Sequence, residues 1–162
     1  RGFESRREYQ NMLKVGFTGT KQGMTVEQKK VFWETVMVNE ISEFHHGDCV
    51  GADADAHEIM VTDHDIIIHP PKNPSKRAFC KKYREIREEK EYLDRNHDIV
   101  DETDMLIACP CGHSEVIRSG TWATIRYATK RGKLVFIIYP DGTISYRNRL
   151  TTDRQLTCPY FY

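Results

Sequence analysis

The chain has 162 residues, of which 39% are hydrophobic and 30% are charged, a composition typical of one globular domain. Its 24 Lys and Arg residues balance 24 Asp and Glu residues, which argues against a protein held on nucleic acid mainly by charge, because such proteins carry a basic excess. No apolar run reaches the ~20 residues that cross a bilayer, so no membrane segment is expected.

The N-terminal part of the chain predicts a strand followed by a helix. Hydrophobic residues alternate over 13–17 and indicate the strand. Thr25 and Gln28 match a capping box, which begins a helix whose apolar residues recur at helical spacing as far as Phe44. Trp33 is predicted to lie in the core.

Two more strands and a helix are expected before residue 70. A short strand ends near His45 and His46. Neighbouring side chains of a strand point to opposite faces, so one of these histidines is expected at the edge of a crevice, and neither is assigned a catalytic role. Residues 52–60 present small and apolar side chains along one helix face, and the β-branched run 66–68 indicates a buried parallel strand.

The second half of the chain continues the alternation of helices and strands. A charged helix is predicted over 75–96. Asp141 and Gly142 predict a tight turn, which precedes a short hairpin strand that uses Ile144 and Tyr146. The other predicted elements are a strand at 105–109, a helix at 122–131 and a strand at 134–139.

The order of these elements predicts the fold class. Buried apolar strands separated by helices indicate a mainly parallel sheet with helices on both faces. We therefore expect a Rossmann-like, three-layer α/β/α fold with a sheet of about five or six strands. One domain is expected to span residues 12–149, with terminal extensions at 1–11 and 150–162.

The chain has five cysteines, and this odd number indicates reduced thiols and a cytoplasmic protein rather than a disulfide framework. Cys109, Cys111 and His113 are close in sequence, but a C-x-C pair without a distant second pair is weak evidence for zinc. No metal site and no cofactor are predicted.

Three loops rich in Gly, Thr, Ser and Asp follow predicted strands. Connections that leave the carboxyl ends of parallel strands face one crevice, so these loops are expected to meet there. Glycines let a ligand approach the backbone, hydroxyl groups donate hydrogen bonds to oxyanions, and free N–H groups at a helix start favour phosphate. The residues predicted to bind the ligand are Thr18, Gly19 and Thr20 in the first loop, Gly47, Asp48, Gly51, Ala52 and Asp53 in the second, and Arg118, Ser119, Gly120, Thr121 and Trp122 in the third.

Three side chains in this set have alternative interpretations. Asp48 and Asp53 repel phosphate but can accept hydrogen bonds from a ribose diol, whereas Asp53 also suits a helix start. Trp122 either stacks on a base or packs in the core. No catalytic residue is assigned.

The motifs in and between these loops resemble those of a known superfamily. The segment from Gly47 to His57 (G-x3-G-A-D-x2-A-H) is similar to the glycine-rich segment of the DNA-processing protein A family, and residues 95–108 (R-N-x2-I-V…D-x-L-I-A) are similar to the same lineage. Residues 118–122 (R-S-G-T-W) lie where LOG-type, cytokinin-activating proteins carry a Gly-Thr motif. From about residue 14 to residue 140, the chain thus resembles a small stand-alone member of the SLOG superfamily.

This resemblance implies a Rossmann-like fold that binds nucleotides or nucleotide-derived molecules, and a homodimer is a further expectation from the family. LOG-type hydrolases carry acidic residues directly after the Gly-Thr pair, where this chain has Ala123 and Thr124. Cleavage of a glycosidic bond calls for a carboxylate at the reacting centre, so this departure favours binding over hydrolysis.

We therefore expect the domain to bind a nucleotide or an ADP-ribose-like molecule through these loops. The first alternative is an enzyme that hydrolyses the N-glycosidic bond of a nucleoside 5′-monophosphate, a phosphoribohydrolase. The second is a single-stranded nucleic-acid binder, which the neutral charge argues against. The sequence leaves open whether the protein is an enzyme.

Overall fold

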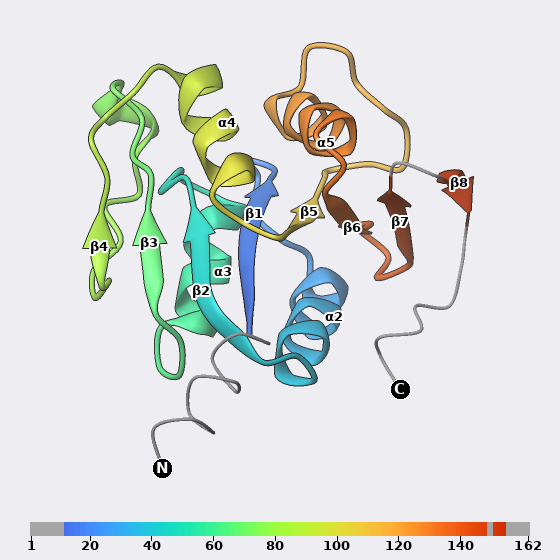
Figure 1. Cartoon of the computed structure of the whole chain (residues 1–162), viewed down its shortest axis with the longest axis horizontal. Coiled ribbons are helices and arrows are strands. Elements are labelled where there is room, and N and C mark those ends of the chain that lie inside the picture. Colours follow the sequence, from blue (N-terminus) through green and yellow to red (C-terminus); the bar gives the residue numbers. More distant parts are fainter. Residues whose placement is uncertain (1–11, 149–150, 155–162) are drawn as a thin grey trace.

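An eight-stranded sheet in the order β4-β3-β2-β1-β5-β6-β7-β8 forms the centre of the structure, a computed structural model that describes residues 12–148 and 151–154 (Figure 1). The predicted extension at 1–11 lies outside the described residues. The strands are β1 (Leu13–Gly19), β2 (Ile41–His46), β3 (Ile66–Ile68), β4 (Glu85–Ile86), β5 (Met105–Cys109), β6 (Leu134–Ile138), β7 (Ile144–Asn148) and β8 (Thr151–Arg154), and the helices are α2 (Val26–Met37), α3 (Ala52–Met60), the 3-10 helix η1 (Pro74–Lys76), α4 (Tyr92–Asp101) and α5 (Gly120–Lys130).

The sheet is mainly parallel, as predicted. Strands β1 to β6 pair in parallel, and β7 and β8 add an antiparallel edge. Helices α2 and α3 pack on one face, and α4 and α5 pack on the other, which gives the predicted three layers (Figure 1). The sheet has more strands than the five or six expected, because β4 and β8, which extend its two edges, carry no apolar run or alternation that predicts a strand.

Two buried clusters, one on each face of the sheet, form the core. On the α2 and α3 face, the rings of Phe17, Phe32 and Phe44 pack with centroids 5.4–5.9 Å apart. Interlocked aromatic rings of this kind contribute beyond the apolar area that they bury. The cluster on the α4 and α5 face contains Val100, Leu106, Ala108, Trp122, Ile125, Ala128, Val135 and Ile137.

Helix α2 begins where its sequence predicts but ends earlier. The capping box of Thr25 and Gln28 is present. The helix stops at Met37, and Phe44 belongs to β2, where it pairs with β1. The prediction that Trp33 lies in the core is wrong, because its neighbours face the sheet and leave Trp33 52% exposed.

The prediction of a charged helix over 75–96 is wrong. The segment forms η1, extended chain, the short β4 and only the first turns of α4. Backbone bonds attach it to the loop after β2: Ala78 N–H donates to the carbonyl of Asp48 at 2.8 Å, and Cys80 N–H donates to its carboxylate at 2.9 Å. Charged residues without an apolar stripe give a helix no face to bury, so these long-range bonds determine the conformation.

The C-terminal part of the sheet includes residues that the sequence assigned to an extension. The predicted hairpin strand with Ile144 and Tyr146 is present as β7, and Thr151–Arg154 of the predicted extension form β8 beside it. Within the described ranges, no helix is long and apolar enough to cross a membrane.

Candidate functional site

A cleft of about 490 Å³ lies at the carboxyl ends of β1, β2 and β5. The loops that follow these three strands meet there, as the parallel topology predicts. The lining residues are Gly19, Thr20, Lys21 and Gln22 after β1, Cys49 and Val50 after β2, Ser75 and Lys76 of η1, Tyr92 at the start of α4, Cys111 after β5, and Arg118, Ser119, Gly120 and Thr121 at the start of α5.

The charge of this cleft is positive, although the chain as a whole is neutral. Three of the lining residues, Lys21, Lys76 and Arg118, are cations. None of the lining residues that the structure describes carries a carboxylate. A cleft with charges of one sign concentrates the field and attracts ligands of the opposite sign, here anions.

The N-terminus of α5 adds backbone donors to the cleft. The side chain of Ser119 caps the helix by accepting a hydrogen bond from Trp122 N–H at 3.4 Å. The N–H groups of Gly120 and Thr121, the first two of the helix, have no intramolecular acceptor in the part of the chain that the structure describes. Such N–H groups, at the positive end of the helix dipole, suit a phosphate or carboxylate.

At the N-terminus of α3, by contrast, the first N–H of the helix is occupied. Ala52 N–H donates to the carbonyl of Thr20 at 2.9 Å. Gly51 precedes the helix with φ +98°, and a Cβ there would lie 2.4 Å from the carbonyl oxygen of Lys21. Gly51 and Ala52 therefore hold α3 against the loop after β1, and they do not line the cleft to which the sequence assigned them.

The two carboxylates of the loop after β2 also point away from the cleft. Asp48 is fully buried and accepts hydrogen bonds from Arg77 Nε and Cys80 N–H, both at 2.9 Å. Asp53 is 6% exposed and accepts from Cys49 N–H at 3.0 Å. Both side chains organise the loop, and neither is placed to accept a hydrogen bond from a ribose in the cleft.

The remaining predicted residues outside the cleft lie in the core or beneath the loops. Trp122 is 2% exposed and packs in the α4 and α5 cluster, so its ring offers no surface to a base. Thr18 is buried within β1. The carbonyl of Gly47 accepts a hydrogen bond from buried Arg95, whose guanidinium also donates to the carbonyl of His69 at 3.2 Å.

Sequence reasoning missed Tyr92, whose ring lines the cleft. The Arg95 guanidinium lies 4.8 Å from the ring centroid and the Lys76 ammonium 5.8 Å from it. A Cβ on Gly120 would lie 2.0 Å from the Tyr92 hydroxyl, so the ring keeps this position only beside a glycine. The one sequence signal in this region is Asn73-Pro74, because Asn73 caps η1 and so positions Lys76.

The structure places both histidines of β2 in the interior, against the prediction for them, and it also shows the surroundings of the cysteine motif. His45 and His46 are 1% and 0% exposed, because helices cover both faces of the sheet, so neither lies at a crevice edge. Cys109 is buried in the core, and His113 stacks on Tyr139.

The burial of Asp53 beneath the loop after β2 can be tested by the pH dependence of stability. Burial raises its pKa from the ordinary 3.8 to about 6, although Arg95 and the hydrogen bonds from Cys49 and Gly47 oppose the rise. Between these two values the folded chain holds a proton that the unfolded chain has released, so raising the pH through this window removes stability. The loss amounts to about 3 kcal/mol.

We therefore expect the stability difference between the wild type and Asp53→Asn to shift in favour of the variant by roughly 2 kcal/mol from pH 4 to pH 7, the part of the total loss that falls in this range. Denaturant unfolding across this range measures it. Exposed Asp63→Asn is the control. A difference that stays constant with pH would show that Asp53 has an ordinary pKa.

Fold and cleft together define a Rossmann-like α/β protein with an anion-suited crevice at the carboxyl edge of its sheet. No protein-family model matches the sequence, and no curated protein matches it. Solved structures that are similar to this chain include the following two. The molybdenum cofactor binding protein of Rippkaea orientalis has a TM-score of 0.56 and 19% identity over 79% of this chain and 77% of that chain.

The second is DNA processing protein A of Helicobacter pylori, which was solved for its single-stranded DNA binding mode. It has a TM-score of 0.56 and 17% identity over 81% of this chain and 67% of that chain. This similarity confirms, for the fold, the resemblance that the sequence motifs predicted. At such identities the likeness defines the fold and leaves the ligand to the chemistry of the cleft.

Proposed function

We propose that this protein binds a nucleotide or a nucleotide-derived molecule such as ADP-ribose in the cleft, with a phosphate at the N-terminus of α5. The observation that carries the proposal is that three cations line the same cleft as two free backbone N–H groups, with no carboxylate among the described lining residues. Phosphate is the ligand group that such donors bind best. The volume of about 490 Å³ lies in the range of small-molecule sites.

Tyr92 supports a ligand that carries a base as well as a phosphate. It is the one aromatic residue among the described residues that line the cleft. The cationic groups of Arg95 and Lys76, at 4.8 and 5.8 Å from the ring centroid, hold the ring in place. Aromatic faces stack on bases of any sequence. The two structural neighbours, which are described as binding a molybdenum cofactor and single-stranded DNA, agree with a nucleotide-like ligand on this fold.

The proposed function is binding without turnover. Cleavage of an N-glycosidic bond needs a carboxylate near the reacting centre. Asp48 and Asp53, the two carboxylates that the sequence predicted for the site, are occupied by internal hydrogen bonds, and no described lining residue carries a carboxylate. Release of free base from nucleoside 5′-monophosphates, followed by chromatography, would contradict this part of the proposal.

A thermal-shift screen tests the proposal. The panel contains AMP, ADP, ADP-ribose and NAD, with adenosine as the phosphate-free comparison. A ligand at a hundred times its Kd adds about 2.7 kcal/mol of stability, which gives a clear rise in Tm. A panel in which no phosphate-bearing compound raises the Tm would contradict the proposal.

Arg118→Ala locates the ligand within the cleft. Loss of a charge-assisted hydrogen bond to phosphate costs about 1.5–3 kcal/mol, so the Kd is expected to rise roughly ten- to a hundredfold. Lys130→Ala, at the exposed other end of the same helix, is the matched control and leaves the Kd unchanged. Equal effects of the two substitutions would place the ligand elsewhere.

A further inference from the structure

Among the residues that the structure describes, two groups of potential metal ligands lie away from the cleft, on opposite faces of β2. One consists of His46, His57 and Cys80, and the other of His45, His69 and Glu102. In each group the ligand atoms lie within 4.8 Å of one another. The positions of the ring protons decide which group can accept an ion, because a coordinating nitrogen must offer a lone pair.

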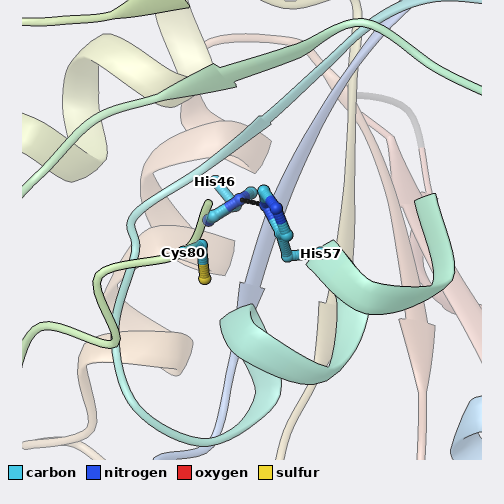
Figure 2. A group of neighbouring side chains, drawn as sticks. All are labelled: His46, His57 and Cys80. Carbon is cyan, nitrogen blue, oxygen red and sulfur yellow. Dashed lines mark hydrogen bonds between the residues drawn. The ribbon is translucent and has the colours of Figure 1, made fainter. Parts of the chain in front are cut away.

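The first group is a closed chain of hydrogen bonds. His46 Nδ1 accepts from Asp48 N–H at 3.0 Å, so its proton is on Nε2 and is donated to His57 Nδ1 at 2.9 Å (Figure 2). The remaining proton of His57, on Nε2, is donated to the carbonyl of Lys81 at 2.6 Å. His46 thus presents an N–H rather than a lone pair to its neighbours, and this group serves to join β2, α3 and the segment after η1.

In the second group, the histidine of β2 presents a lone pair to its neighbours instead of an N–H. His45 Nε2 lies 2.9 Å from Glu43, a carboxylate that Arg84 also contacts at 2.6 Å. An ionised carboxylate can only accept, so Nε2 carries the proton and Nδ1 offers its lone pair. That lone pair points to His69 Nε2 at 2.9 Å, and Glu102 Oε2 lies 3.4 Å from the same nitrogen.

We propose that His45 Nδ1, His69 Nε2 and Glu102 Oε2 form a binding site for a divalent transition metal, with Zn²⁺ the best fit. Two imidazoles and one carboxylate are an established zinc ligand set that leaves a position for water. Glu43 supplies the outer carboxylate that fixes the orientation and tautomer of a zinc-bound histidine. On metal binding, the ring proton of His69 moves from Nε2 to Nδ1.

The surroundings of this site fit an ion that reaches it from solvent. The side chains of His45 and His69 are 1% and 2% exposed, whereas that of Glu102 is 38% exposed and opens the site at the end of α4. Arg87 donates to Glu102 Oε1 at 3.0 Å, which leaves Oε2 for the metal but places a positive charge beside it. Replacement of Arg87 is therefore expected to tighten metal binding.

Metal titration of the full chain tests this proposal, which is independent of nucleotide binding. After chelator treatment and dialysis, Co²⁺ is added and its visible absorption is followed, and Zn²⁺ affinity is measured by competition. We expect one ion at this site, with Glu102→Gln and His69→Gln each weakening binding about ten- to a hundredfold. Arg87→Gln strengthens binding, and Cys80→Ser leaves it unchanged.

The half-exposed Glu102→Gln variant keeps the test valid if substitution of buried His69 disturbs folding, which a thermal melt monitors. If the Glu102→Gln variant binds the metal as tightly as the wild type, the proposal is overturned, whichever other residues hold the ion. A loss of binding in Cys80→Ser, together with loss of a thiolate-to-cobalt absorption band, would assign the ion to the group in Figure 2 instead. Absence of Co²⁺ and Zn²⁺ binding would also overturn it.

Discussion

Gly120→Ala is expected to weaken nucleotide binding by roughly five- to a hundredfold. The new Cβ would lie 2.0 Å from the Tyr92 hydroxyl and 2.5 Å from its ring. Tyr92 must then rotate out of its position beside Arg95, and the ring moves within the cleft that it lines. If the ligand needs the ring in its present place, holding it there against this clash costs about 1–3 kcal/mol, which corresponds to roughly five- to more than a hundredfold in Kd.

Gly112→Ala is the matched control for this substitution, because a Cβ on Gly112 would have no atom within 4 Å. Titration of AMP into both variants gives the comparison. Equal Kd values for the two variants would show that the space beside Tyr92 is not part of the binding site.

The largest expected effect on stability comes from Asp48→Ala. The buried carboxylate holds the Arg77 guanidinium and the Cys80 N–H at 2.9 Å, so its removal leaves the 13% exposed Arg77 side chain without its buried partner. Breaking a buried ion pair in this way costs about 3–5 kcal/mol. Asp48 also has φ +55°, a conformation that Ala tolerates less well than Asp.

Denaturant unfolding measures this loss, and Asp48→Asn separates its causes. Asparagine tolerates the positive φ and keeps one acceptor oxygen, so its loss is expected to be clearly smaller. A decrease of less than about 1 kcal/mol for Asp48→Ala, the value of an exposed ion pair, would mean that Asp48 does not anchor the segment after η1.

The parts of the fold that local patterns determine could be predicted from the sequence. The β-branched run of β3, the apolar run of β6 and the capping box of Thr25 each specify their own conformation without reference to distant residues. The segment 75–96 could not be predicted, because hydrogen bonds to Asp48, far away in the sequence, replace the apolar face that a helix there would need.

The same distinction applies to the cleft. Parallel topology alone brings the loops after β1, β2 and β5 together, so Gly19, Thr20 and the start of α5 could be placed from sequence. The direction of a carboxylate within a loop depends on its partners. Asp48 and Asp53 turn inward to Arg77 and to backbone donors, which no spacing rule indicates.

The proposed metal ligands were hidden from sequence reasoning for a related reason. His45 and His69 are separated by a helix and a strand, and they meet only because β2 and β3 are neighbours in the sheet. The expectation of no metal rested on the Cys109–His113 motif, a segment remote from these histidines. Proton positions, which only the hydrogen-bond network reveals, then separate one histidine pair from the other.

Calorimetric titration of AMP and of adenosine into the same protein sample tests the central claim most directly, since the two compounds differ only in the phosphate. If the N-terminus of α5 and its three neighbouring cations hold that phosphate, AMP binds at least tenfold more tightly than adenosine, and added salt narrows the gap. Equal affinities, or no binding of either AMP or the larger adenine nucleotides, would contradict an anion site in this cleft.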